Sequence, residues 1–214
     1  MTEYQKINSI YKRGPRGEFL VGEWSCEEFA YLQDSLWQWT EKVDGTNIRL
    51  HFDSHDAAFR GNEHAYVAGR TDGAQLPPNL LNRLVEIMKR MPLEEVFPDA
   101  NVGEGYGAKI QKGGGNYIPD GCDFVLFDVK VGDWWLRRPD VEDVAARLDL
   151  MVVPIVAEVT LREAIELVRA GEWKSAWPGV TQPEGLVGRP AVDLWDRRGD
   201  RVITKIKHRD LVRG

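Results

Sequence analysis

One lysine, Lys42, stands in a turn between two segments that have strand character. It belongs to the stretch WTEKVDGTNIRLHF (residues 39–52). A K-x-D-G sequence there begins at the end of LWQWTEKV and leads into TNIRLHFD. A lysine amine can act as a nucleophile, but only after it has lost its proton, which burial or nearby positive charge favours. A lone K-x-D-G is more typical of a solvated turn lysine than of a nucleophile, so this motif by itself predicts no chemistry.

Two more lysines alternate near the end of the chain, in TKIKH (residues 204–208). If this segment is a strand, Lys205 and Lys207 point to the same face, because side chains alternate along a strand. If that face lies beside Lys42, the three amines repel one another and favour loss of a proton from the nucleophile. The same pair of lysines could hold a phosphate.

Two carboxylates and one arginine lie next to glycines, which let a ligand approach the backbone. Glu104 is part of GEGYG and Glu184 is part of PEGLVG. Together with Asp44, they could hold a hydrated Mg²⁺ through oxygen. Arg70, in GRTDG, is expected at the end of a strand, where its guanidinium could fork onto a phosphate. Each of these residues alone is more typical of a surface charge, so their order along the chain is the stronger indication.

Apolar spacing predicts the elements that position these residues. Helices are expected over 78–91, 139–150 and 160–171, the last with Thr160 and Glu163 as a capping box and Gly171 as its end. Strands are expected over 18–24, 36–43, 46–53, 64–71, 101–107, 122–131, 133–138, 184–190 and 200–208. This pattern predicts an α+β fold, with helices flanking antiparallel sheet, in a single domain over residues 1–214.

The charge of the chain is unevenly distributed. The net charge is −6, but residues 197–214 carry seven Lys and Arg against Asp200 and Asp210, so this segment is +5 and the remainder is −11. A basic terminus on an acidic body suits a polyanion bound locally, although a solubilising tail explains it as well.

Other features predict a cytoplasmic protein without a membrane partner. No apolar run reaches the roughly 18–20 residues that span a bilayer, and the N-terminus lacks the order of a signal peptide. Cys26 and Cys122 are far apart in the sequence, which favours free thiols over a disulfide.

Six blocks in one order connect these observations: EKVDGTN, GRT, GEGYGAKIQ, FVLFDV, EGLVGRP and RVITKIKH, from about Glu41 to His208. They resemble the nucleotidyltransferase motifs of ATP-dependent RNA ligases, especially the phage T4-type ligases that seal nicks in duplex RNA and the kinetoplastid RNA-editing ligases. The ordered set is far more specific than K-x-D-G alone. The resemblance implies an adenylyltransferase fold and a role in RNA repair.

The resemblance also implies a role for each matched residue. Lys42 would attack the α-phosphate of ATP, expel pyrophosphate and carry AMP, while Lys205 and Lys207 would grip that phosphate. The other nucleotide-binding residues would be Glu41 at the adenine edge, Asp44, Gly45 and Asn47 near the phosphate, Arg70 on the phosphate of AMP or RNA, Glu104 on the ribose, and Phe127 stacked on adenine. Glu184, with Asp44 and Glu104, would hold Mg²⁺ or Mn²⁺. AMP would then pass to an RNA 5′-phosphate, which a 3′-hydroxyl would attack.

Some alternatives stay open at this point. Phe127 lies in an apolar strand, where core packing competes with stacking on adenine. The chain ends six residues after His208, where T4-type ligases continue into an RNA-binding domain, so a lone nucleotidyltransferase domain is expected. A monomer that acts on nicked duplex RNA or RNA ends is the leading expectation. The alternatives are a minimal ATP-dependent DNA ligase, an mRNA-capping guanylyltransferase, and a non-catalytic module that binds a nucleotide or an RNA end.

Overall fold

The computed structural model describes residues 3–52, 65–91, 100–171 and 173–212. Contacts divide the chain into two compact units, each with its own sheet and core. Unit 1 comprises Met1–Tyr4 and Asp44–Val153, and unit 2 comprises Gln5–Val43 and Pro154–Gly214. The chain therefore leaves unit 2 between Val43 and Asp44, inside the K-x-D-G motif, and returns to it at Pro154. A single domain over residues 1–214 stays a prediction.

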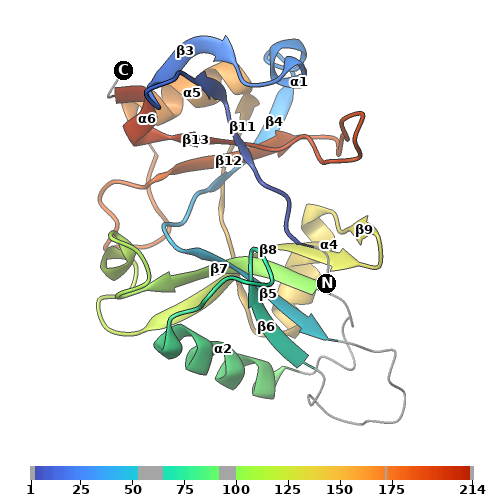
Figure 1. Ribbon diagram of the computed structural model, residues 1–214, viewed down its shortest axis with the longest axis vertical. Coiled ribbons are helices and arrows are strands. Elements are labelled where there is room, and N and C mark those ends of the chain that lie inside the picture. The colour runs from blue at the N-terminus through green and yellow to red at the C-terminus, as the bar shows by residue number, and fades with distance from the viewer. Residues whose placement is uncertain (1–2, 53–64, 92–99, 172, 213–214) are drawn as a thin grey trace. The chain divides into compact units, whose positions relative to one another are not determined.

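Unit 1 is built on a six-stranded sheet with the strand order β10-β8-β7-β5-β6, and β9 pairs with β8 (Figure 1). These strands are β5 (Thr46–Phe52), β6 (Ala65–Gly69), β7 (Ala100–Gly107), β8 (Cys122–Val131), β9 (Trp134–Trp135) and β10 (Met151–Val152). All pairs are antiparallel except β10 with β8. A short 3₁₀ turn, η2 (Gly114–Asn116), follows β7.

Two helices cover the apolar face of the unit 1 sheet. They are α2 (Pro78–Arg90) and α4 (Arg138–Arg147). Leu80, Leu84 and Met88 of α2 recur every four residues and are buried against Ile48 of β5, as expected for an amphipathic helix.

Unit 2 is built on a five-stranded sheet with the strand order β1-β13-β12-β4-β11. Its strands are β1 (Asn8–Ser9), β4 (Leu36–Glu41), β11 (Ile155–Thr160), β12 (Gly185–Pro190) and β13 (Thr204–Lys207), and only β1 runs parallel to its neighbour. A separate hairpin pairs β2 (Tyr11–Arg13) with β3 (Phe19–Trp24). The helices are α1 (Glu27–Tyr31), α5 (Leu161–Ala170) and α6 (His208–Val212).

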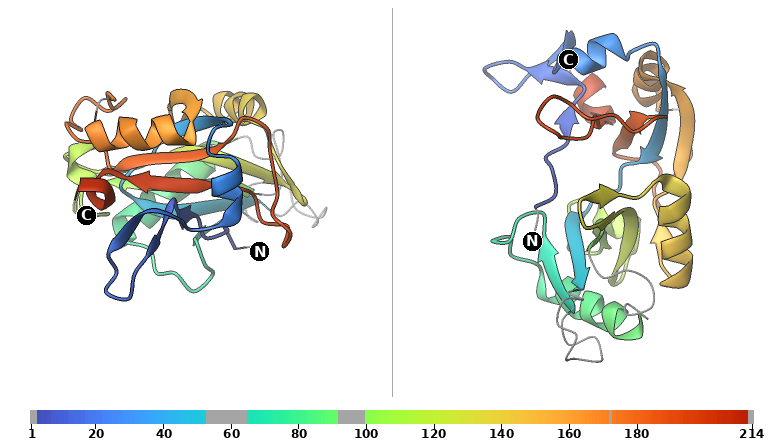
Figure 2. Two further views of the ribbon diagram at one scale, coloured as in Figure 1. Left: turned by 90° about the horizontal axis from the view of Figure 1, so that it is seen from above. Right: turned by 90° about the vertical axis from the view of Figure 1, so that its right-hand side faces the viewer.

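The core of unit 2 lies between its sheet and α5, which runs across one face of the strands (Figure 2). Trp37 and Trp39 of β4 are fully buried there with Leu161 and Ile165 of α5. The predicted capping box is present, because the Thr160 side chain accepts from the Glu163 N–H and the Glu163 carboxylate accepts from Thr160. Gly171 ends the helix with a left-handed φ of 69°.

The α+β fold with mainly antiparallel sheets is confirmed, and every predicted helix is present. Strand β7 ends at Gly107 as expected and begins one residue earlier than predicted, at Ala100. The sequence patterns did not predict the short elements β1, β2, α1 and α6, nor the edge strand β11. Cys26 and Cys122 are free, as predicted. In the described part of the chain, no helix combines the length and the apolar content needed to cross a bilayer.

Candidate active site

Four charged side chains of unit 2 converge around the ends of β4, β12 and β13, and we call them the lysine cluster: Lys42, Glu184, Lys205 and Lys207. Lys42 Nζ lies 2.6 Å from Glu184 Oε2, and Lys207 Nζ lies 2.5 Å from Glu184 Oε1. One carboxylate therefore binds two ammonium groups. The expectation that Lys42 and the pair in TKIKH come together is confirmed within this unit.

Backbone pairing explains why these residues meet. Strand β12 lies between β4 and β13, with Gly185 opposite Lys207 and Leu186 opposite Glu41. The Lys42 N–H donates to the Gly185 carbonyl at 2.9 Å. A Cβ atom at Gly185 would lie 2.0 Å from the Ile206 carbonyl oxygen, so only glycine allows β12 and β13 to approach this closely beside Glu184.

The electrostatics of the lysine cluster suit an anionic ligand. The side chains of Lys42, Lys207 and Glu184 are only 18%, 17% and 13% exposed. Burial raises the pKa of Glu184, but the charges of Lys42 and Lys207 outweigh it and hold that pKa below its usual value. Burial and the neighbouring lysine charges lower the pKa of Lys205. With one carboxylate among three amines, the cluster retains positive charge that a phosphate could neutralise.

The side chain of Glu41, next to Lys42, points into unit 2. It is 2% exposed, and its carboxylate accepts from the Ser175 hydroxyl at 2.6 Å and the Ala176 N–H at 3.1 Å. Burial raises the pKa of Glu41, although these two hydrogen bonds oppose the effect. The adenine contact of Glu41 stays a prediction. Ser175 and Ala176 had no recognisable pattern in the sequence, so their role was missed.

Unit 1 carries the second half of the K-x-D-G motif. Asp44 Oδ2 accepts from the Gly113 N–H at 3.1 Å, and the Asp44 N–H donates to Tyr117 Oη at 3.2 Å. A Cβ atom at Gly45 would lie 2.4 Å from the Gly105 carbonyl oxygen. The turn therefore contacts both β7 and the glycine-rich loop QKGGGNY (residues 111–117). The sequence analysis did not predict the contact of this loop with Asp44.

Asn47 and Glu104 lie side by side on one face of the unit 1 sheet. The register places them directly opposite each other on β5 and β7, and both are half-buried. Asn47 Oδ1 is buried and has no hydrogen-bond partner among the described residues. Buried polar atoms are rarely left without a partner, so this oxygen suits a bound ligand.

A β-bulge places Phe127 on the face away from the core. Along β8 the core positions are Phe124 and Leu126, and then Val129. The register shifts between Val102 and Gly103 of β7, so that two successive residues, Phe127 and Asp128, both lie off the core face. Phe127 is half-buried, makes an edge contact with Tyr4 at 5.5 Å between ring centroids, and lies outside the apolar core of unit 1. Core packing therefore does not account for it, and its stacking on adenine stays a prediction.

Arg70 follows β6 and is exposed. A second arginine that the sequence analysis missed, Arg49, holds this strand end in place. Arg49 is 1% exposed, donates to the Gly69 carbonyl at 2.7 Å and pairs with Asp72 at 2.7 Å. Arg49 occupies a regular polar position between Ile48 and Leu50, so the sequence pattern did not indicate its burial or its structural role.

The predicted metal ligands are divided between the units. Glu184 belongs to unit 2, whereas Asp44 and Glu104 belong to unit 1. Among the described residues, no group of three or more His, Cys, Asp or Glu side chains is arranged to hold a metal ion. The metal-binding role of these three residues stays a prediction.

Comparison with known proteins agrees with these motifs. The family model of RNA ligases matches residues 35–207. A search of curated protein sequences finds no match. Similar solved structures include an alanine mutant of Naegleria gruberi RNA ligase with ATP and Mn, which has a TM-score of 0.60, 20% identity, and coverage of 87% of this chain and 53% of that one.

Two further structures of Naegleria gruberi RNA ligase agree with the first. Another alanine mutant with ATP and Mn has a TM-score of 0.63 and 17% identity, and the alignment covers 98% of this chain and 59% of that one. The form with PPi has a TM-score of 0.60 and 18% identity, with 98% and 63% covered. At this identity the likeness shows the fold, and this chain spans less than two thirds of the length of these proteins.

Proposed function

Because the chain belongs to the RNA ligase family, we propose that it is an ATP-dependent RNA ligase. It would form a lysyl-AMP intermediate on Lys42, transfer AMP to an RNA 5′-phosphate and join that phosphate to a 3′-hydroxyl. The observation that carries this proposal is the lysine cluster, in which Lys42 lies 2.6 Å from Glu184 beside Lys205 and Lys207. The ATP, Mn and PPi present with the similar proteins support it.

In the first step, the deprotonated Lys42 amine attacks the α-phosphorus of ATP. A P–N bond forms, the bond from that phosphorus to the oxygen that bridges to the β-phosphate breaks, pyrophosphate leaves, and the attacking nitrogen releases one proton to solvent. Glu184 stays ionised because its pKa is lowered, so it can hold the Lys42 side chain in position. Lys205 and Lys207 supply positive charge where negative charge develops, which is the main source of catalysis in phosphoryl transfer.

The residues present fit the nucleotide and the metal that this function requires. The positive charge of the lysine cluster fits a phosphate, and the unpartnered Asn47 Oδ1 offers an acceptor. Carboxylate oxygens suit a hydrated Mg²⁺ or Mn²⁺, although both Glu184 oxygens bind lysines in this structure. When bound, the metal would neutralise charge on the phosphates. Glu184, Asp44 and Glu104 would hold it.

The finer features of the substrate and setting also belong to this proposal. We propose nicked duplex RNA or RNA ends as the substrate, and a monomer located in the cytoplasm. The two free thiols support a reducing compartment. A DNA ligase and a non-catalytic binding module are the competing functions, and covalent labelling separates the module from both enzymes.

The decisive experiment is incubation with radiolabelled ATP, GTP and NAD⁺, followed by mapping of the modified residue. Label from ATP is expected on Lys42, stable to base and labile to acid, as for a phosphoramidate. Lys42→Ala should abolish it, whereas Lys89→Ala, which removes an exposed lysine of α2, should not. Label that persists in Lys42→Ala would refute the assignment, and absence of label from any nucleotide would favour the binding module.

A further inference from the structure

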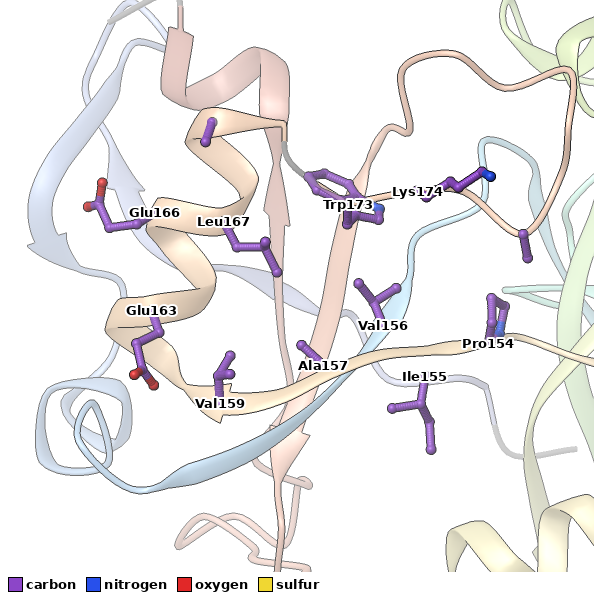
Figure 3. Close-up of a pocket in the computed structure, with 12 residues that line it drawn as sticks. Pro154, Ile155, Val156, Ala157, Val159, Glu163, Glu166, Leu167, Trp173 and Lys174 are labelled. Atoms are coloured by element: carbon purple, nitrogen blue, oxygen red, sulfur yellow. The ribbon is translucent and has the colours of Figure 1, made fainter.

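Unit 2 contains a pocket of about 760 Å³ that is separate from the lysine cluster (Figure 3). It lies between β11, α5 and residues 173–176, and no member of the lysine cluster lines it. Its volume falls within the range of small-molecule sites, about 300–1,000 Å³. We call it the β11–α5 pocket.

Most of the residues that line the β11–α5 pocket are apolar, and Val156 and Val159 of β11 point to the side of the strand on which Leu167 of α5 and Trp173 lie (Figure 3). Trp173 is 8% exposed, and its indole N–H has no acceptor among the described residues. Buried donors are nearly always satisfied in folded proteins. An acceptor oxygen on a bound molecule would satisfy this one.

One side of the β11–α5 pocket carries a positive charge. Lys174 is exposed and forms no ion pair with a described residue. Glu163 and Glu166 lie on α5, away from Lys174 (Figure 3). Glu166 pairs with Arg169 at 2.6 Å, whereas Glu163, among the described residues, accepts only from the N–H and the hydroxyl of Thr160 and keeps its negative charge. On the Trp173 side of the pocket, away from these two carboxylates, the charged lining group is the ammonium of Lys174 (Figure 3).

We propose that the β11–α5 pocket binds a small amphipathic anion, with a flat apolar body and one carboxylate or sulfonate group. The apolar body packs between β11 and α5. The anionic group lies near Lys174, with an oxygen available to the Trp173 N–H. This binding does not depend on the ligase activity proposed above.

The walls of the pocket are bonded to the residue beside the nucleophile. Ala176 lines the pocket and donates its N–H to the Glu41 carboxylate at 3.1 Å. Pro154 also lines it, and its carbonyl accepts from the Glu41 N–H at 3.1 Å. An occupant that restrains these walls restrains Glu41, and with it the backbone that leads into Lys42.

Two fluorescent probes with the same apolar body test the proposal. One is 1-anilinonaphthalene-8-sulfonate, and the other is the neutral N-phenyl-1-naphthylamine. We expect one sulfonate probe to bind saturably to each chain. Its affinity should be higher than that of the neutral probe. Lys174→Ala should weaken only the sulfonate, by about three- to fivefold, the strength of an exposed ion pair. Equal affinity of the two probes, or an unchanged preference in Lys174→Ala, would overturn the assignment of the anion.

A second variant tests the location without removing a lysine. Ala157→Trp places a large ring in the pocket, because Ala157 lines it and is half-buried. It should abolish saturable binding of both probes, while Ala191→Trp, at an exposed position, should bind them like the wild type. Circular dichroism establishes that each variant is folded. Binding that survives in folded Ala157→Trp would overturn the site.

Hydrogen exchange tests the link to Glu41 without any nucleotide. On addition of the sulfonate probe, exchange of the Glu41 N–H should slow by at least about threefold, because its acceptor Pro154 is part of the occupied wall. The effect should disappear in Ala157→Trp. Unchanged exchange in wild-type protein saturated with probe would refute the link.

Discussion

Replacing Glu184 with glutamine tests whether one carboxylate holds the lysine cluster together. Its two oxygens lie 2.6 Å and 2.5 Å from the Lys42 and Lys207 amines, and its side chain is 13% exposed. Glutamine keeps the shape and removes the charge. Removing one partner of a buried pair costs about 3–5 kcal/mol, and because some exposure remains we expect a loss near 3 kcal/mol in the free energy of unfolding.

The loss should depend on pH in a defined direction. The pKa of Glu184 is depressed in the folded protein because the charges of Lys42 and Lys207 outweigh the burial that raises it. A depressed carboxyl pKa contributes stability that is fully present above the unfolded pKa and is lost as the pH falls through the folded pKa. The pKa of a glutamate in the unfolded chain is about 4.3. The difference in free energy of unfolding between wild type and Glu184→Gln should therefore be constant above about pH 5.5 and become smaller below about pH 4.

Urea denaturation, followed by the fluorescence of the buried Trp37 and Trp39 of unit 2, measures this loss. With a slope of about 3 kcal/mol/M, the midpoint should fall by about 1 M. The matched control is Glu166→Gln, because Glu166 also pairs at 2.6 Å but is 67% exposed, and such exposed pairs contribute about 0–1 kcal/mol. A loss for Glu184→Gln no larger than the control, or a gap that does not narrow in acid, would refute the reasoning.

The same residue should affect the chemistry. Glu184→Ala is expected to remain folded and to slow labelling of Lys42 at limiting Mg²⁺ by about ten- to a hundredfold, the usual cost of losing a residue that orients a metal or its ligands. A folded variant that is labelled at the normal rate under these conditions would remove Glu184 from the metal site.

Three further outcomes are expected. A nick with an RNA 3′-hydroxyl end should be sealed faster than an all-DNA nick, since the 2′-hydroxyl lets a protein distinguish the two; equal rates would favour a DNA ligase. Arg197 and Arg198 are exposed and form no ion pair with a described residue. Neutralising both should make the slope of log RNA affinity against log salt concentration shallower by about 0.9, the value for B-form duplex, for each phosphate that the protein no longer neutralises. Labelling of Lys42 should continue. If labelling collapses and the slope is unchanged, RNA is held elsewhere. Thr160→Ala should destabilise unit 2 by about 1 kcal/mol through loss of the capping box that begins α5, and an unchanged urea midpoint would show that the cap contributes nothing.

Local patterns in the sequence were enough for the longer elements and for the chemistry of the motifs. Leu80, Leu84 and Met88 recur at the helical period, and Thr160 with Glu163 marks a helix start, because these signals depend on neighbours within a few residues. The alternation of Lys205 and Lys207 likewise predicted one shared face. The ordered motifs pointed to the RNA ligase family, which the family model confirms.

The short or atypical elements were not visible in this way. Strand β11 lies at the edge of its sheet and is partly exposed along its length, so it lacks a strong alternation. Helices α1 and α6 have five residues each, which is too short to display a helical period.

Several features of the site were decided only by the tertiary structure, because they depend on residues far apart in the chain. The Glu184 carboxylate is shared by Lys42 and Lys207, and the Glu41 carboxylate is held by Ser175, across 134 positions. The bulge that turns Phe127 away from the core arises from the pairing of β8 with β7. A sequence specifies which side chains alternate, but register and burial follow from how distant strands pair and pack, since one residue of slip moves a side chain to the opposite face.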